Sequence, residues 1–378
     1  MAGASIDAGG IARLERWLAA RVPGAEAVRL GELRRLSGGY SAETIVLEAL
    51  VTSGGRERAE KFVLRREMPE PAVYPVQAPG LDVEIETQWR TMQALARQAP
   101  VPLASDALIP LASDALVPLA PLIGFERDPG VVGAPFFVMG FVDGVVPSVA
   151  PPYAAQGFFA DAKPEERARL VEDGLRVLAR IHSVDWRAAG FGWLTPPGVA
   201  AGTARQLELW ERYATRELAG REHPLMSEAF AWLRARLPRE SERDLVLSWG
   251  DARIGNMIWR DFRCACVTDF ENVAIAPRAF DLGWWLMFDR WSHESMGLVP
   301  RLAGEPTRDE QRALYEKHAG TSVGDTTYYE VLAAARYCAI VVRVMNRSVA
   351  RGEMPPDQRV WLENPATVCL AELLRGVR

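Results

Sequence analysis

Cysteine is scarce in this sequence of 378 residues, which contains only Cys264, Cys266, Cys338 and Cys369. No two of them form a CxxC pair, and a Cys-x-Cys pair on one strand places both side chains on the same face. This pattern argues against a disulfide framework and against a zinc site, and it indicates a reducing compartment.

Long hydrophobic runs are also missing. No stretch of 18 apolar residues occurs, which argues against a membrane-spanning helix. Near the N-terminus, Ile11–Val22 carries Arg13, Glu15 and Arg16, so it does not have the apolar core of a signal peptide. We therefore expect a cytoplasmic protein without a membrane partner.

An excess of positive charge is absent as well. The net charge is −5, with 44 Lys and Arg against 49 Asp and Glu, and the pI is about 5.6. Such a chain has no overall positive field that would attract nucleic acid, and we expect no nucleic-acid partner.

The composition is that of a globular protein, with 49% hydrophobic and 25% charged residues. The length exceeds one ordinary core and indicates two packed units. We expect an α+β fold with an N-terminal helix in residues 1–24. A β-rich unit should span 25–142, and a mainly helical unit with a small β hairpin should span 143–378. The pattern does not indicate an oligomeric state.

Strand patterns dominate the first unit. The segments Val28–Leu36, Thr44–Leu50, Lys61–Arg66 and Phe136–Val142 read as strands, and Val83–Leu95 reads as the one helix among them. After about residue 147, helical spacing dominates. The predicted helices there are Pro164–Val184, Thr203–Ala219, His223–Leu237, Asp281–Trp291, Arg308–His318, Thr327–Ser348 and Glu363–Leu374.

Two local features of the first unit have more than one interpretation. The turn Ser37-Gly38-Gly39-Tyr40 fits a phosphate-binding loop, because glycine lets the backbone lie close to a phosphate, but a plain hairpin turn fits it better. The eight-residue tandem repeat that begins at Val101 is too short for a solenoid, and we interpret it as a loop insertion.

Three polar residues stand out in Leu245–Glu271, which reads as strand, tight loop, strand, hairpin turn and strand. Asp251 is followed five residues later by Asn256, and Asp269 comes after the hairpin. Two acids and an amide at the ends of adjacent strands could hold a divalent cation against a polyphosphate and place a base beside a hydroxyl. Taken singly, Asp251 and Asn256 also fit turn or cap residues.

This segment resembles the catalytic segment of aminoglycoside phosphotransferases and of choline-kinase-like small-molecule kinases. The resemblance rests on Trp249-Gly250-Asp251-Ala252-Arg253-Ile254-Gly255-Asn256 followed by Thr268-Asp269-Phe270-Glu271, against a family pattern of HGDxxxxN, a short hairpin and D-[FW]-E. It extends in order over about residues 25–290. The resemblance implies a two-lobe fold of protein-kinase type with an αC-like helix in the N-terminal lobe.

The resemblance also implies roles for the residues of this segment. Asp251 corresponds to the catalytic base, and Asn256 and Asp269 correspond to Mg²⁺ ligands. Arg253 stands where a cation would neutralise the transferring phosphoryl group. Asp281 corresponds to a buried acid that braces the catalytic loop.

In the first unit, the resemblance implies a nucleotide site. Ser37, Gly38, Gly39 and Tyr40 correspond to the loop over the phosphates, and Arg65 to the phosphate-pairing residue of the third strand. Met139 and Phe141 correspond to the hinge whose backbone pairs with the nucleotide base. Gln88 matches the αC glutamate best, with Glu84 one turn earlier.

The sequence departs from the family pattern at three positions. Trp249 replaces a His, and we expect it to replace the packing of that His but not its hydrogen bonds. Arg65 replaces a Lys, which changes the geometry of phosphate pairing. Gln88 is neutral where the family has an acid, so it should hold Arg65 less firmly.

Two further residues have open or structural interpretations. Glu271 fits a member of the metal shell and a capping residue equally well. His182 reads as a packed residue at a helix end, since no acid stands at a telling spacing from it.

The sequence thus predicts an ATP-dependent phosphotransferase, with GTP as an alternative donor, that needs Mg²⁺ and acts on a hydroxyl group of a small molecule such as an aminoglycoside. The alternatives are a kinase of a hydroxylated metabolite (a hydroxyacyl thioester, choline or a sugar) and a kinase-like protein that binds nucleotide without turnover.

Acidic residues that would suit a polycation occur in the helical unit, but a solvated helix face explains them as well. They are Glu208, Glu211, Glu217, Glu222, Asp289 and Glu294.

Overall fold

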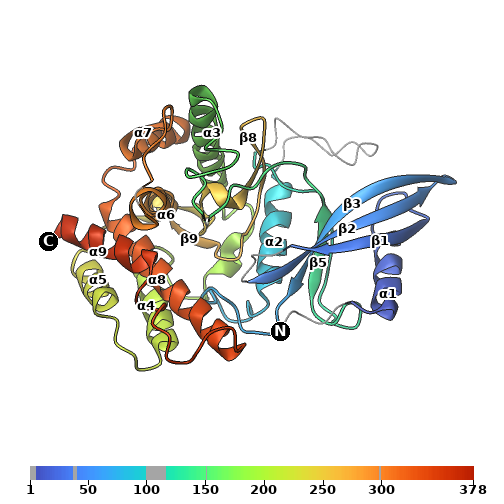
Figure 1. The fold of residues 1–378 in the computed structure, drawn as a ribbon, viewed down its shortest axis with the longest axis horizontal. Helices are drawn as coiled ribbons and strands as arrows, with labels where there is room; N and C mark the ends of the chain where they lie inside the picture. Colours follow the sequence, from blue (N-terminus) through green and yellow to red (C-terminus); the bar gives the residue numbers. More distant parts are fainter. Residues whose placement is uncertain (1–5, 37–40, 99–115, 150, 298) are drawn as a thin grey trace.

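The computed structural model describes residues 6–36, 41–98, 116–149, 151–297 and 299–378, which form a sheet unit and a helical unit (Figure 1). The sheet unit is N-terminal, and the chain then builds the helical unit. The expected α+β arrangement is therefore confirmed. The predicted loop insertion lies mostly outside the described residues.

The sheet has five antiparallel strands in the order β1-β2-β3-β5-β4. These strands are β1 (Ala27–Arg35), β2 (Ala42–Ser53), β3 (Arg56–Glu67), β4 (Leu122–Glu126) and β5 (Phe136–Gly140). Gly54 and Gly55 connect β2 to β3 with φ values of +55° and +70°. A two-residue hairpin turn of this kind needs positive φ at both positions, which glycine adopts without a steric penalty.

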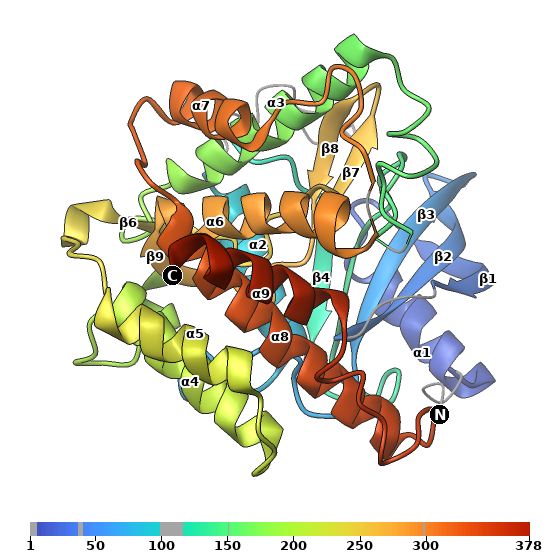
Figure 2. The same cartoon turned by 60° about the vertical axis from the view of Figure 1, so that its left-hand side comes forward.

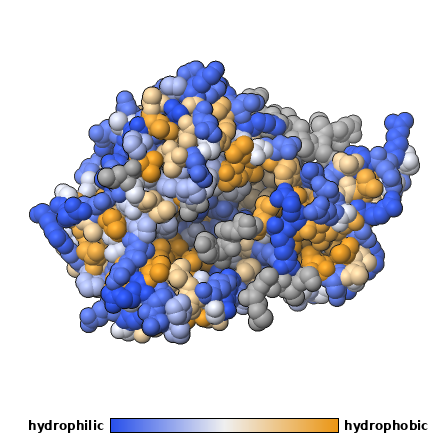
Figure 3. All heavy atoms as spheres, in the orientation of Figure 1, coloured by the Kyte–Doolittle hydropathy of each residue, from blue (hydrophilic) through white to orange (hydrophobic). Residues whose placement is uncertain are grey.

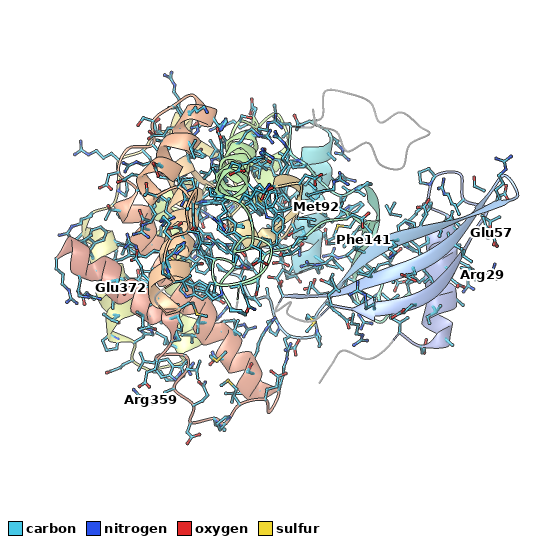
Figure 4. The ribbon with its side chains drawn as sticks, turned by 45° about the horizontal axis from the view of Figure 1, so that its top comes forward. Arg29, Glu57, Met92, Phe141, Arg359 and Glu372 are labelled. Atoms are coloured by element: carbon cyan, nitrogen blue, oxygen red, sulfur yellow. The ribbon has the colours of Figure 1, made fainter. Side chains whose placement is uncertain are left out.

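Two helices pack on this sheet. Helix α1 (Ala8–Ala19) lies against β1, and the Trp17 indole donates to Glu126 Oε2 at 2.9 Å. Helix α2 (Glu84–Ala96) lies between the sheet and the helical unit and buries Ile85 and Met92 (Figures 1 and 4). Helix α2 is the αC-like helix that the sequence predicts.

The helical unit is organised around its longest helix. Its helices are α3 (Pro164–His182), α4 (Thr203–Leu218), α5 (Pro224–Ala235), α6 (Arg278–Arg290), α7 (Arg308–Ala319), α8 (Thr327–Ala350) and α9 (Pro365–Val377). Helix α8 contacts α4, α5, α6 and α9, while α3 packs against α7 (Figure 2). One hydrophobic cluster runs from Leu47 and Phe62 of the sheet unit to Leu175 and Trp259 of the helical unit, so the two units share a core.

Two small sheets lie in the helical unit and carry the segment that stands out in the sequence. Strand β6 (Leu245–Ser248) pairs with β9 (Ala274–Pro277), and β7 (Met257–Arg260) pairs with β8 (Arg263–Val267). The sequence predicts β6, β7 and β8 but not β9 or β4. Both missed strands are short, and β9 ends in a proline, so their patterns are weak.

Among the described residues, no helix combines the length and the apolar character that crossing a membrane requires. On the face shown in Figure 3, the surface is hollowed between the helical unit and the sheet unit.

Candidate active site

A buried carboxylate fixes the end of β6. Asp281, in the first turn of α6, is fully buried. Its Oδ1 accepts hydrogen bonds from Ser248 Oγ and Gly250 N, both at 2.8 Å. Its Oδ2 accepts from Trp249 N at 2.6 Å and lies 2.9 Å from His182 Nε2. Asp281 therefore braces the loop that carries Asp251, while the catalytic role of that loop stays a prediction.

The contact of His182 corrects one expectation. The sequence shows no acid near this residue, yet Asp281, 99 positions away, is its partner. The other ring nitrogen, Nδ1, lies 2.6 Å from Tyr315 Oη. His182 is therefore a buried part of the brace, which agrees with its predicted structural role but not with the absence of an acid partner.

The turn after β6 requires glycine at position 250. Gly250 has φ +86°, and a Cβ atom there would lie 1.8 Å from the Asn272 carbonyl oxygen. Its own carbonyl accepts from Asn272 Nδ2 at 3.0 Å and from Arg336 Nη2 at 2.9 Å. Arg336 is buried with its guanidinium 4.4 Å from the Trp284 ring centroid, and burial lowers its pKa to about 9. The loop that carries Asp251 is thus held from behind by a cation that packs on aromatic rings.

The side chain of Asp251 is buried and has three hydrogen-bond donors. Its Oδ1 accepts from Arg253 Nε at 3.0 Å and from Trp284 Nε1 at 2.8 Å. Its Oδ2 accepts from Tyr74 Oη at 3.1 Å. A carboxylate held at one oxygen and facing a hydroxyl at the other has the geometry of a general base.

Arg253 forms an ion pair with Asp251 and lies above an aromatic ring. Its Cζ atom is 5.2 Å from the Phe288 ring centroid. Burial lowers the pKa of Arg253, but the Asp251 carboxylate, together with Tyr74, Tyr337 and Asp269, raises it by more. The cation therefore stays charged beside Asp251, and its contact with a transferring phosphoryl group stays a prediction.

Arg65 of β3 meets the end of the catalytic segment. Its Nη1 donates to Asp269 Oδ1 at 2.9 Å, and its Nη2 donates to Glu271 Oε1 at 2.7 Å. The same Glu271 oxygen accepts from Gln88 Nε2 and Ser41 Oγ, both at 2.6 Å. Gln88 and Arg65 both donate to Glu271, so Gln88 contacts Arg65 only through that acceptor, which agrees with the expectation of a weaker hold than a Glu would give. Glu271 is therefore the common acceptor of three side chains in this cluster rather than a cap of the following segment.

Negative charge exceeds positive charge around Arg65. Burial, followed by the Asp269 carboxylate, raises the pKa of Glu271 well above its usual range, and Arg65 offsets this only in part. Burial and the Glu67 carboxylate raise the pKa of nearby Glu84 to about 7. Asp269 itself has φ +56°, which is uncommon for a residue other than glycine, and its side chain is 27% exposed. This side of the loop has the surplus charge and the access that a cation would use.

Asn256 connects Asp251 to the segment of Asp269. Its Nδ2 donates to the Asp251 carbonyl at 3.0 Å. Its own carbonyl accepts from Thr268 N at 3.0 Å and from Thr268 Oγ1 at 2.9 Å. Hydrogen bonds thus connect Asp251 and Asn256 to the residue before Asp269, and the binding of a metal by Asn256 and Asp269 stays a prediction.

Trp249 does more than pack. Its indole Nε1 donates to the carbonyls of Thr268, at 2.9 Å, and Asp269, at 3.2 Å. The indole nitrogen thus reaches the backbone beside Asp269, and the expectation that Trp249 does not replace the hydrogen bonds of the family's His stays a prediction.

Three predicted parts of the nucleotide site have different outcomes. Ser37–Tyr40 lies outside the described residues. Met139 pairs with Val63 in the sheet, and the N–H of Phe141 donates to the Lys61 carbonyl at 3.1 Å. Phe141 lies near the junction of the two units (Figure 4). Nucleotide contacts by Met139 and Phe141 stay predictions.

Sequence reasoning missed Tyr74. The Trp284-Trp285 pair reads mostly as core packing, with the wall of an acceptor pocket as the alternative for one ring, and neither interpretation indicates the bond from Trp284 to Asp251. Tyr74 lies between prolines, at 71 and 75, in a segment without strand or helix periodicity. Its contact with Asp251 spans 177 positions, so no local pattern could have indicated it.

Known proteins resemble this chain over most of its length. The model of the "Phosphotransferase enzyme family" matches residues 32–321. The "Probable acyl-CoA dehydrogenase IBR3" of Arabidopsis thaliana is 23% identical over 261 residues, which are 66% of this chain and 27% of that protein. The chain thus spans about a quarter of the length of that curated relative.

Solved structures share the fold. The crystal structure of a "putative aminoglycoside phosphotransferase" from Ralstonia eutropha JMP134 has a TM-score of 0.66 at 23% identity, over 97% of this chain and 96% of that one. The ethanolamine kinase of Plasmodium vivax has a TM-score of 0.52 at 12% identity, over 91% and 81%. These structures confirm the two-lobe fold of protein-kinase type.

Proposed function

The chain belongs to the phosphotransferase enzyme family, and from that premise we propose that it transfers the γ-phosphoryl group of ATP to a hydroxyl group of a small molecule. The observation that supports this most is Asp251, whose Oδ1 is held by two donors while Oδ2 faces a hydroxyl. The proposal includes the division into a nucleotide-binding unit at 25–142 and a catalytic and acceptor-binding unit at 143–378.

The residues present fit a magnesium ion. Asp269 and Glu271 share one arginine, and a divalent cation beside Asp269 would offset the negative charge that, after burial, raises the pKa of Glu271. Because Asn256 Nδ2 already donates to Asp251, its amide oxygen is the end left for a cation. We assign Asn256 and Asp269 as the ligands, both of which offer the hard oxygens that Mg²⁺ prefers. The ion would neutralise charge on the phosphate oxygens.

The proposed reaction needs one proton acceptor. As the acceptor oxygen forms its bond to the γ-phosphorus, Oδ2 of Asp251 takes the proton of that hydroxyl. The bond from the γ-phosphorus to the bridging oxygen breaks, and ADP leaves with the electron pair. Arg253 keeps the carboxylate oriented, and Arg65 is the cation available to the phosphates. Most of the rate enhancement then comes from positioning and electrostatics.

The charges of the helical unit favour an acceptor other than a polycation. Five of the six acids that would suit an aminoglycoside already form ion pairs with arginines. These pairs are Glu208–Arg212, Glu211–Arg234, Glu217–Arg343, Asp289–Arg301 and Glu294–Arg308. Trp284 and Phe288 lie beside the base and its arginine. We therefore place a hydroxylated metabolite ahead of an aminoglycoside as the acceptor.

The test compares two Asp→Asn variants in an assay of ATP-dependent phosphoryl transfer to a panel of metabolites and aminoglycosides. Asp251→Asn keeps the shape of the side chain but removes the base, so kcat should fall by about 10²–10⁴-fold. Asp261→Asn changes an exposed residue of the β7–β8 turn and should leave kcat unchanged.

Equal turnover by Asp251→Asn and the wild type would refute the role of Asp251. Magnesium-dependent binding of ATP without transfer to any acceptor or to water would instead support the non-catalytic alternative, which Trp249, Arg65 and Gln88 favour as departures from the family pattern. GTP in place of ATP in the same assay decides the nucleotide preference.

A further inference from the structure

The segment between β3 and α2 crosses from one unit to the other and back. We call residues 68–83 the strap. Both of its ends belong to the sheet unit, where it follows Glu67 and precedes Glu84. Its middle contacts helices α4 and α8 of the helical unit. The strap is therefore a second connection between the units, besides the main chain after β5.

Hydrogen bonds fix the strap on both sides of Tyr74. On the N-terminal side, Arg351 Nε donates to Glu70 Oε1 at 2.8 Å, and Arg343 Nη2 donates to the Pro71 carbonyl at 2.7 Å. On the C-terminal side, Gln206 Nε2 donates to Gln77 Oε1 at 2.9 Å. Tyr74 thus lies in the anchored middle of the strap and not at a loose tip.

Tyr74 also bonds to the one side-chain oxygen of Asp251 that receives no other donor from the described residues. Oδ1 has Arg253 and Trp284, whereas Oδ2 has the Tyr74 hydroxyl at 3.1 Å. A base must lie about 2.6–3.2 Å from the hydroxyl whose proton it takes. The phenol therefore has the distance and the chemical group of an acceptor at the base.

The charge state of Tyr74 fits this role. Burial, followed by the Asp251 carboxylate, raises its pKa well above 10. The phenol keeps its proton at neutral pH and donates it to Oδ2, as an alcohol would.

We propose that the Tyr74 hydroxyl occupies the place of the acceptor hydroxyl on Asp251. The strap thereby closes the acceptor site until the hydroxyl of an acceptor displaces the Tyr74 hydroxyl from Oδ2. This inference rests on the proposed phosphoryl transfer. It assigns the strap, which the sheet unit contributes, as a wall of the acceptor site. Until an acceptor arrives, the same contact keeps water from Oδ2 and limits the transfer of the phosphoryl group to water.

The test measures MgATP hydrolysis without an acceptor, together with MgATP binding by calorimetry. Tyr74→Phe keeps the ring but frees Oδ2, so hydrolysis should rise about tenfold over the wild type, the factor that corresponds to one hydrogen bond to a charged group. The double variant Tyr74→Phe/Asp251→Asn should not show that rise, because it has no carboxylate at position 251 to take a proton from water. Tyr328→Phe is the matched control, since the Tyr328 hydroxyl is buried without a hydrogen-bond partner among the described residues, and it should match the wild type.

A second pair of variants tests the strap without changing Tyr74. Arg351→Gln breaks the bond to Glu70 and should raise hydrolysis in the same direction, by about two- to threefold, because a loosened surface ion pair is worth less than the tyrosine contact. Arg359→Gln, in an exposed pair with Glu363, should have no effect. In Figure 4, Arg359 lies at the lower edge of the helical unit.

The outcomes separate the inference from the proposed function. If Tyr74→Phe binds MgATP but hydrolyses it no faster than the wild type, the inference is overturned; a fall would make Tyr74 a residue that supports Asp251 instead. If neither protein binds MgATP, or if the hydrolysis persists in Asp251→Asn, the proposed function itself fails.

Discussion

The two sides of the loop that carries Asp251, which we call the Asp251 loop, differ in how fully their charges are balanced. Behind the loop, the single carboxylate of Asp281 accepts from Ser248 and two backbone amides, and its other neighbour is the His182 ring. In front, Asp269 and Glu271 share Arg65, and Glu84 lies close by.

This difference in charge balance distinguishes carboxylates that stabilise the fold from carboxylates that can bind a ligand. A carboxylate whose lone pairs all meet donors stabilises the fold and has no capacity for a ligand. A group of carboxylates with too few cations weakens the fold until a cation arrives. Substitutions behind the loop should therefore reduce stability first, and substitutions in front should reduce activity first.

The largest expected effect is on the brace. Asp281→Asn turns one accepting oxygen into an NH₂ group that faces donors, so the free energy of unfolding should fall by about 3–5 kcal/mol. Urea denaturation followed by tryptophan fluorescence measures it, with Asp261→Asn in the exposed turn as the control. An unchanged unfolding midpoint would show that the bonds to Asp281 do not hold the loop.

The next effect should be on activity with little cost in stability. Asp269→Asn removes one of the crowded charges and keeps the shape, so we expect kcat to fall about 100-fold or more while Tm stays or rises. Asp173→Asn is a control with the opposite expected result, a loss of stability without a loss of activity. Asp173 is buried and paired with Arg176 at 2.6 Å, so its loss should lower Tm and leave kcat unchanged. If Asp269→Asn destabilises the protein as strongly as Asp281→Asn, the comparison between the two sides fails.

Trp249 lies between the two sides and should give an intermediate result. Trp249→Phe keeps an aromatic ring in the core but leaves the carbonyls of Thr268 and Asp269 without the indole donor, at a cost of about 1–2 kcal/mol of unfolding free energy. Trp232→Phe loses no hydrogen bond, because Trp232 Nε1 has no partner among the described residues, and should cost less in the same urea titration. Equal costs would reduce Trp249 to a packing residue.

The sequence predicts the Asp251 loop well because its residues are close in the chain. Asp251, Asn256 and Asp269 lie within one turn and one hairpin, so their spacing alone constrains where they meet. The helices follow from their 3.6-residue periodicity, and most observed bounds differ from the predicted ones by one to three residues.

The contacts around the loop depend on distant segments and could not be predicted. Arg65 meets Asp269 across 204 positions, and Tyr74 meets Asp251 across 177. The strap has neither helix nor strand periodicity, so the sequence does not indicate where it lies. The contact of Gln88 with Glu271 could not be predicted for a related reason: local spacing placed Gln88 on the inner face of α2, but only the fold determines that Glu271 lies there.

The smallest expected effect concerns Glu84 and depends on pH. Its pKa is raised to about 7 in the folded protein, so the folded state binds more protons than the unfolded state between about pH 4.5 and pH 7. Stability should therefore be undiminished below pH 4.5 and should fall as the pH rises through 7. Glu84→Gln has no proton to lose, so its Tm should exceed that of the wild type by about 2–5 °C at pH 8 and match it near pH 4.5.

Differential scanning calorimetry between pH 4.5 and pH 8 measures this difference. Glu86→Gln, on the same turn of α2 but partly exposed and paired with Arg127, is the control and should follow the wild type across the range. A constant offset between Glu84→Gln and the wild type at every pH would mean that Glu84 carries no unbalanced charge. The front of the loop would then hold less surplus charge than its three carboxylates indicate, and the case for a cation there would rest on Asp269 and Glu271 alone.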